Sequence, residues 1–120
     1  MPKNIIITGA NGALGTAVVK KFLDSGYKVI AVDRSGKRPD YVKDNRQYEA
    51  HKVNLDNEEE TLAFAKEAIK KYGKIDGALL LAGGFAMGDI HATNSKALKK
   101  MFSLNFDTAY NIARPVFQHM

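Results

Sequence analysis

Three glycines follow an apolar run near the start of the chain, at a spacing that suits phosphate binding. The segment NIIITGANGALGTAV places Gly9, Gly12 and Gly15 where a strand would become a helix. The first glycine permits a tight turn, the second lets the main chain approach a ligand, and the third lets the helix pack closely on its strand. The N–H groups and positive dipole end of such a helix bind diphosphate. The pattern predicts a dinucleotide-binding turn, the alternative being glycines that only shape a turn.

An acidic residue ends the second apolar run, in the segment AVDRSGKR. Asp33 lies about 18 positions after Gly15, where a carboxylate can accept hydrogen bonds from the adenosine ribose and repel a 2′-phosphate. Asp33 therefore favours NAD. Arg34, Lys37 and Arg38 follow it, and a guanidinium there could instead hold the phosphate of NADP. We expect NAD, with NADP as the less favoured alternative, and interpret the three basic side chains as a solvated loop.

The elements that must position these residues are visible as four apolar runs separated by helical patterns. The expected strands are Asn4–Thr8, Lys28–Val32, Gln47–Val53 and Asp76–Ala82, and the expected helices are Leu14–Ser25, Glu58–Tyr72 and, approximately, Ser95–His119. Three of the runs are continuous rather than alternating, which is typical of parallel strands covered on both faces. The order of elements predicts an α/β fold of Rossmann type, with helices on both faces and strand order 3-2-1-4.

The helical patterns also predict which residues begin each helix and which face inward. Asp56 is expected to cap the second helix, with Glu59 completing a capping box. In the first helix the spacing places Leu14, Val18, Phe22 and Leu23 on the inner face. In the last helix it places there Leu98, Met101, Phe102, Phe106, Ala109 and Ala113. The connection from Arg34 to Arg46 contains Gly36 and Pro39 and is expected to be a loop with at most a short helical turn.

Composition limits the function classes. The 120 residues carry a net charge of +5, but the Lys and Arg residues are spread along the chain, so we expect no nucleic-acid binding. No apolar run approaches the ~18 residues that span a bilayer, and the start MPKNIII does not resemble a signal peptide. The absence of cysteine excludes thiolate chemistry, and the histidines have no ligand spacing, so we expect no metal site. A cytoplasmic protein is the expectation.

With these features the chain resembles the short-chain dehydrogenase/reductase family. TGANGALG stands where the family carries TGxxxGxG, with the middle glycine displaced by one, as in the sugar-nucleotide epimerases of its extended branch. KVNLDN resembles the segment that borders adenine, with Asn54 and Leu55 in the family positions. LLLAGGFAMG stands where most members have Asn-Asn-Ala-Gly, and its paired glycines are more similar to dihydropteridine reductase. The match corresponds to the first half of a typical member.

The resemblance implies a set of site residues. The cofactor would be held by Gly9, Asn11, Gly12, Ala13, Leu14, Gly15, Asp33, Arg34, Asn54, Leu55, Ala82, Gly83 and Gly84. MFSLNFDTAYNIARPVFQHM is similar to the helix that carries the family's catalytic asparagine, here Asn105, which helps to hold a water in a proton relay. The alternative is an amide that ties the helix backbone to a neighbouring strand. Tyr110 and Arg114 have the four-residue spacing of the family's Tyr-x-x-x-Lys pair but lie on the asparagine's own helix, so we interpret them as packing and surface charge.

Three functions remain open. The first is the dinucleotide-binding half-domain, residues 1–120, of a longer oxidoreductase that moves hydride between nicotinamide and a small carbonyl or alcohol. The second is a non-catalytic nucleotide-binding module or a folding fragment, and the third an epimerase-like member of the extended branch. Self-association into a homo-oligomer is expected, through the apolar edge strand GALLLA or through the last helix.

Overall fold

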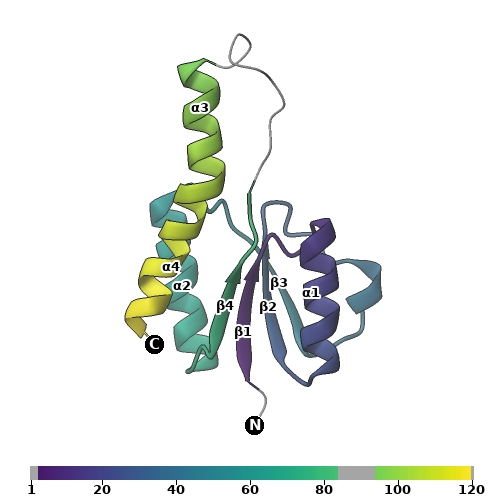
Figure 1. Ribbon diagram of the computed structural model, residues 1–120. Helices are drawn as coiled ribbons and strands as arrows, with labels where there is room; N and C mark the ends of the chain where they lie inside the picture. The colour runs from purple at the N-terminus through teal and green to yellow at the C-terminus, as the bar shows by residue number, and fades with distance from the viewer. Residues whose placement is uncertain (1–2, 84–93, 120) are drawn as a thin grey trace.

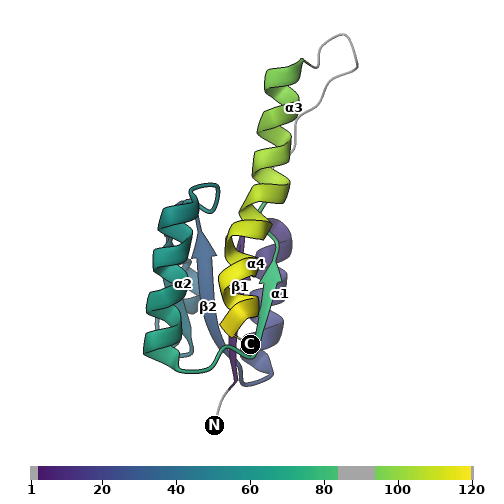
Figure 2. The same cartoon turned by 90° about the vertical axis from the view of Figure 1, so that its left-hand side faces the viewer.

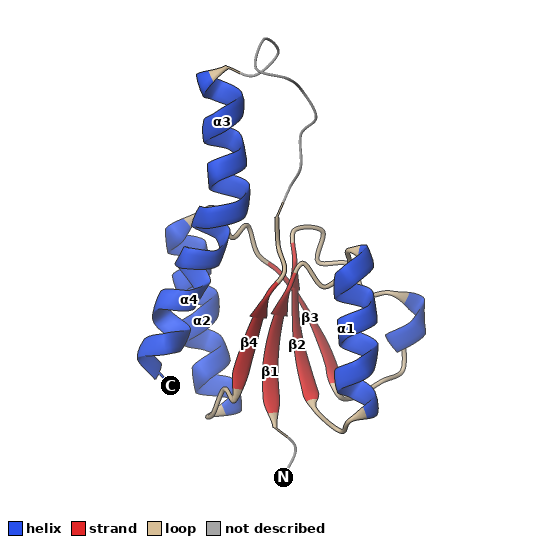
Figure 3. Cartoon of the chain, in the orientation of Figure 1, coloured by secondary structure: helices blue, strands red, loops and turns tan. Residues whose placement is uncertain are grey.

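The computed structural model describes residues 3–83 and 94–119. Four parallel strands form one sheet in the order β3-β2-β1-β4, as predicted. Their bounds are β1 Asn4–Thr8, β2 Lys28–Asp33, β3 Tyr48–Lys52 and β4 Gly77–Leu80. The helices are α1 Ala13–Asp24, α2 Glu58–Tyr72, α3 Ser95–Phe102 and α4 Thr108–His119, with a π-helical segment η2 Ser103–Asp107 and a short 3-10 turn η1 Asp40–Val42. Figure 3 shows the four arrows pointing the same way, toward the edge where the glycine turn lies.

Along each continuous apolar run, successive residues point alternately to the two faces of the sheet, and each face has its own hydrophobic core. Ile6 faces a cluster closed by α2 and α4, whereas Ile5 and Ile7 face a cluster closed by α1 and η1. Ile30 and Val29 divide in the same way on β2. Figures 1 and 2 show α1 on one side of the sheet and α2 with α4 on the other. Burial on both faces is the reason that these strands carry no polar alternation.

The amino ends of β1 and β4 are fastened by reciprocal hydrogen bonds. Asn4 N donates to Asp76 Oδ2 at 2.8 Å, and Asp76 N donates to Asn4 O at 2.8 Å. The Asn4 side chain donates in turn to the Lys74 carbonyl at 2.8 Å. The backbone N–H of Asn4 lowers the pKa of Asp76 below its usual value. This fastening sets the register in which Thr8 and Leu80 end side by side at the carboxyl edge.

Helix α2 has the predicted bounds but a different cap. Asn57, not Asp56, is the N-cap, and its Oδ1 accepts from Glu60 N at 3.0 Å. Glu60, not Glu59, reaches back, and its Oε1 accepts from Asn54 N at 3.1 Å. The capping residues are therefore shifted by one position, because an asparagine caps as well as an aspartate and the sequence offers both.

Two predictions of inward-facing residues are wrong in part. In α1, Leu14 is 64% exposed, and the buried residues are Gly15 and Val19. In the last helix Leu98, Phe102 and Phe106 are each more than half exposed. The buried residues there are Thr108, Ile112 and Val116. Figures 1 and 2 show the reason: α3 rises beyond the carboxyl edge of the sheet, and only α4 lies alongside it.

Candidate functional site

The turn between β1 and α1 needs glycine at two of its three positions. Gly9 has φ +64°, and a Cβ there would lie 2.8 Å from the backbone of Leu81 and Ala82. A Cβ at Gly15 would lie 2.1 Å from the carbonyl oxygen of Gly9. At Gly12 the nearest atom is that same oxygen, at 3.4 Å, which is ordinary contact. The fold therefore requires Gly9 and Gly15, whereas it leaves space at Gly12.

Helix α1 begins without a side-chain cap. Its N-cap is Gly12, which has no side chain to offer, and its first turn contains no acidic residue. Helices α2 and α3 are capped by Asn57 and Asn94, and α2 has three glutamates in its first turn. Among the described residues, no side chain caps the first N–H groups of α1, so they can bind an external acceptor, and the positive end of the helix dipole favours an anion there.

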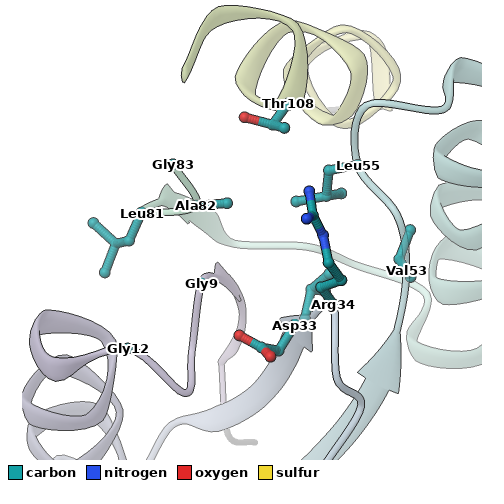
Figure 4. A pocket seen from close by; sticks show the side chains of 11 residues that line it. Gly9, Gly12, Asp33, Arg34, Val53, Leu55, Leu81, Ala82, Gly83 and Thr108 are labelled. Carbon is teal, nitrogen blue, oxygen red and sulfur yellow. The ribbon is translucent and has the colours of Figure 1, made fainter. Parts of the chain in front are cut away.

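A cleft of about 330 Å³ opens at the carboxyl edge of the sheet, above this turn. It lies between the ends of β1, β2, β3 and β4 and the first turn of α4 (Figure 4). Its lining residues are Gly9, Gly12, Val32, Asp33, Arg34, Val53, Leu55, Leu81, Ala82, Gly83 and Thr108. Ligands of open α/β sheets bind in this crevice, where the strand order reverses.

Asp33 is held in place by the glycine turn and by its own loop. Its Oδ1 accepts from Asn11 N at 3.4 Å, and its Oδ2 accepts from Ser35 N at 3.1 Å and from Ser35 Oγ at 2.8 Å. The Asn11 side chain donates to Ser35 Oγ at 3.2 Å and to the Lys37 carbonyl at 2.9 Å. In Figure 4 the Asp33 carboxylate lies on the side of the cleft that faces Gly12.

The basic residues after β2 do not share one environment. Arg34 lines the cleft and points past Leu55 toward Thr108 in Figure 4, and Lys37 is exposed. For Arg38, the interpretation as a solvated side chain is wrong. Its guanidinium donates to the carbonyls of Val42, Lys43, Asn45 and Tyr48, at 2.7–3.2 Å.

Arg38 also stacks on a buried aromatic ring. Its guanidinium carbon lies 5.2 Å from the centre of the Tyr48 ring. Burial raises the pKa of Tyr48 to about 12, so the phenol stays neutral at physiological pH. An arginine with this many donors bound to carbonyls is committed to shaping the loop.

The other predicted cofactor residues lie in or around the cleft to differing degrees. Leu55 is buried in the wall, and Ala82 and Gly83 line the cleft, with Ala82 N donating to Thr8 Oγ1 at 3.1 Å. Asn54 is exposed beside Leu55 and does not line the cleft. Ala13 and Leu14 form the exposed first turn of α1. Gly84 lies outside the described residues.

Four residues of the lining were not predicted from the sequence: Val32, Val53, Leu81 and Thr108. Val32 and Val53 stand at the ends of their strands, so the rule that parallel strands present their carboxyl ends to a ligand could have found them. Thr108 comes from a distant helix, and no local pattern marks it. Asn111 was missed as well: its amide donates to the Leu55 carbonyl at 3.0 Å and ties α4 to the wall of the cleft.

Asn105 lies in the π-helical segment η2, one turn before Thr108. Its Nδ2 donates to the Met101 carbonyl at 2.9 Å, within its own helix. Single π turns occur often at functional sites. Tyr110 and Arg114 lie outside the cleft lining: Tyr110 is half exposed, and Arg114 Nη1 lies 4.0 Å from Glu58 Oε1.

Neither a membrane span nor a cluster of metal ligands occurs in the part of the chain that the structure describes. None of the helices within residues 3–83 and 94–119 is long and apolar enough to cross a bilayer. Within the same ranges, no three His, Cys, Asp or Glu side chains gather as metal ligands would.

Comparison with known proteins gives concordant matches. A family model described as short chain dehydrogenase matches residues 3–120. Dihydropteridine reductase of Dictyostelium discoideum is 30% identical over 112 residues, which cover 92% of this chain and 45% of that protein. The chain spans about half the length of the curated relatives it matches.

Solved structures show the same arrangement of elements. ElxO with NADP bound superposes with a TM-score of 0.90 at 25% identity, covering 100% of this chain and 51% of that one. A short chain dehydrogenase from Leptospira borgpetersenii serovar Hardjo-bovis with bound NAD+ has a TM-score of 0.88 at 17% identity, covering 98% and 46%. The second likeness shows the fold alone.

Proposed function

The chain belongs to the short-chain dehydrogenase family, and from this premise we propose that its cleft binds a nicotinamide dinucleotide. The observation that carries the proposal is the uncapped start of α1 at the floor of a cleft bounded by Asp33. The diphosphate would lie against the N–H groups that follow Gly12, where no side chain within residues 3–83 and 94–119 competes for them. The adenosine ribose would lie at Asp33, and the adenine between the apolar walls formed by Val53 and Leu55.

We propose NAD rather than NADP as the preferred dinucleotide. Asp33 places a carboxylate where the 2′-phosphate of NADP would lie, and repulsion would disfavour that phosphate. Arg38, one of three cations that could have held it, is bound to backbone carbonyls instead. Arg34, at the cleft, is the side chain that keeps NADP as the alternative, and ElxO is a family neighbour with NADP bound.

The activity that we propose is reversible hydride transfer to a small carbonyl compound or from the corresponding alcohol. The nicotinamide ring supplies or accepts the hydride when the dinucleotide is bound. The residues of this chain bind and orient the dinucleotide. Asn105 is proposed as part of the proton relay, because it lies in the π segment one helical turn from Thr108 in the cleft wall.

Calorimetric titration of the chain tests the binding proposal. NAD+, NADP+ and ADP-ribose are titrated separately, because ADP-ribose carries the adenosine and diphosphate contacts without nicotinamide. We expect ADP-ribose and NAD+ to bind, and NADP+ to bind more weakly. Replacing Asp33 by Ala should bring the NAD+ and NADP+ affinities closer together. Absence of binding by both ADP-ribose and NAD+ would refute the assignment of the cleft.

We also propose a homo-oligomer, with the last helix as its interface. The rings of Phe102 and Phe106 stack at 4.8 Å between centres, those of Phe106 and Tyr110 at 6.4 Å, and all three residues are at least half exposed. We call these three rings, with Leu98, the aromatic face. A second copy is the partner that fits it, because in a two-fold dimer the same patch on each chain covers the other.

A further inference from the structure

We propose that Ser35 is a positioning residue that fixes the Asp33 carboxylate and thereby sets the discrimination between NAD and NADP. This inference rests on the proposed binding of a dinucleotide in the cleft. Ser35 is not among the residues that line the cleft, and its hydroxyl reaches the proposed ribose site through its hydrogen bond to Asp33.

The neighbours of the Ser35 hydroxyl determine which group it donates its hydrogen to. Its oxygen lies 3.2 Å from the backbone N of Lys37 and 3.2 Å from Asn11 Nδ2, and both of these groups are donors. The orientation of the Asn11 amide is itself settled, because Nδ2 also donates to the Lys37 carbonyl at 2.9 Å. A hydroxyl has one hydrogen to donate and two acceptor positions. With both acceptor positions taken, Ser35 must donate its hydrogen to Asp33 Oδ2 at 2.8 Å.

These contacts leave Asp33 with free acceptor capacity at one oxygen. Oδ2 receives both the hydroxyl and the backbone N–H of Ser35, whereas Oδ1 receives, from the residues that the structure describes, the 3.4 Å contact from Asn11 N alone. A carboxylate oxygen accepts about two hydrogen bonds, so Oδ1 can take one more. A ribose hydroxyl can donate that bond. A 2′-phosphate at this position brings negative charge toward a carboxylate that the network prevents from turning away.

The loop that carries Ser35 is itself seated on the sheet. Gly36 has φ +64°, and a Cβ there would lie 2.5 Å from Lys52 Cβ on β3. The carbonyl of Asp33 accepts from Gly36 N at 3.2 Å and from Val53 N at 3.4 Å. Ser35 therefore connects a loop held by β3 to the glycine turn through Asn11, and Asp33 lies between the two.

The test is the ratio of the NADP+ to the NAD+ dissociation constant, measured by calorimetry on the chain. Ser35→Ala should lower this ratio by about three- to ten-fold, because a hydrogen bond to a charged group is lost and Asp33 is free to turn. Ser35→Thr, which restores the hydroxyl at an exposed position, should return the ratio to the wild-type value. In an Asp33→Ala background, Ser35→Ala should leave the ratio unchanged, because the carboxylate through which it acts is gone.

Ser25→Ala is the matched control. It removes a hydroxyl that donates to the Lys21 carbonyl at 3.0 Å at the far end of α1, and it should leave the ratio unchanged. A general loosening of the fold would weaken both dinucleotides alike and would not move the ratio. Binding of NAD+ with an unchanged ratio in Ser35→Ala overturns this inference alone, as does an equal effect in the Asp33→Ala background. Failure of the wild-type chain to bind either dinucleotide overturns the proposed function, and this inference with it.

Discussion

Gly12 and Gly15 differ in what a side chain would meet, although both belong to the same turn. At Gly15 the carbonyl oxygen of Gly9 lies where a Cβ would be, so the requirement comes from packing. At Gly12 the backbone has φ −74° and ψ 173°, which any residue adopts, and there is space for a Cβ. The fold does not demand glycine at position 12, so its value there is the access that it gives to the N–H groups of α1.

Exchanging these glycines should separate stability from binding. Gly15→Ala should reduce the free energy of unfolding by about 1–3 kcal/mol through overpacking, measured by urea denaturation. Gly12→Ser should keep or raise stability, because serine is a good N-cap. It should nevertheless weaken ADP-ribose binding by about ten-fold or more, since its hydroxyl competes for the N–H groups that the diphosphate needs. Undiminished ADP-ribose affinity in folded Gly12→Ser would contradict the phosphate-binding role.

Residues of the cleft that belong to a recognisable sequence pattern could be predicted, whereas residues that reach it through contacts distant in sequence could not. The glycine spacing and the carboxylate at the end of the second apolar run mark Gly9, Gly12, Gly15 and Asp33 from sequence alone, and all four line or support the cleft. Ser35 and Thr108 carry no such signal. The role of Ser35 depends on an asparagine 24 residues away, and that of Thr108 on where α4 lies.

At the scale of elements, Arg38 makes the largest set of side-chain hydrogen bonds within the connection between β2 and β3. This connection has almost no regular structure beyond the turn η1. Arg38 precedes that turn and donates to the carbonyls of Val42 at its end, of Asn45 after it, and of Tyr48 on β3. A loop without a core of its own can be held in this way because one guanidinium carries five donors in a fixed plane. Since this loop follows directly after Asp33, the hydrogen bonds of Arg38 also support the side of the cleft where the ribose is proposed to bind.

Truncating Arg38 and Arg34 should have opposite consequences. Arg38→Ala should lower the free energy of unfolding by about 2 kcal/mol, because several carbonyls lose a charged donor. It should leave the ratio of NADP+ to NAD+ affinity nearly unchanged. Arg34→Ala, at an exposed position of the cleft, should change stability by less than about 0.5 kcal/mol and weaken NADP+ selectively. A selective loss of NADP+ affinity in Arg38→Ala would show that the guanidinium leaves its carbonyls to bind phosphate.

The helical periodicity predicted the elements better than their faces. Strand order and helix positions follow from apolar runs and their spacing, and the structure confirms them. The last helix carries two apolar stripes, one through Phe102 and Phe106 and one through Ile112 and Val116. Periodicity cannot choose between two such stripes, and the π segment at Ser103–Asp107 changes their phase. Which stripe meets the sheet is decided by α2 and β4, which are distant in sequence.

At the scale of the whole molecule, the aromatic face is the surface through which we propose that two copies of the chain associate. Exposed aromatic rings are common singly, but a run of stacked rings along one helix is typical of protein–protein interfaces. The helix that carries the face runs from α3, which rises beyond the sheet (Figure 1), into α4, whose first residue Thr108 lines the cleft. An interface there would stabilise the helix that carries Asn105 and Thr108, and association would then support the proposed cofactor site.

Placing a charge in the centre of this face should dissociate the oligomer. Phe106→Asp interrupts the stack between Phe102 and Tyr110 and would bury an unpaired carboxylate in any symmetric interface, so light scattering should report a monomer. Leu14→Glu is the matched control, because Leu14 is similarly exposed but lies on α1, and an acidic residue suits the first turn of a helix. By light scattering, that variant should have the same molar mass as the wild-type oligomer. A wild-type chain that stays monomeric at sub-millimolar concentration would refute the proposed homo-oligomer. A Phe106→Asp variant that stays oligomeric would place the interface elsewhere, with the edge strand β4 as the next surface to change.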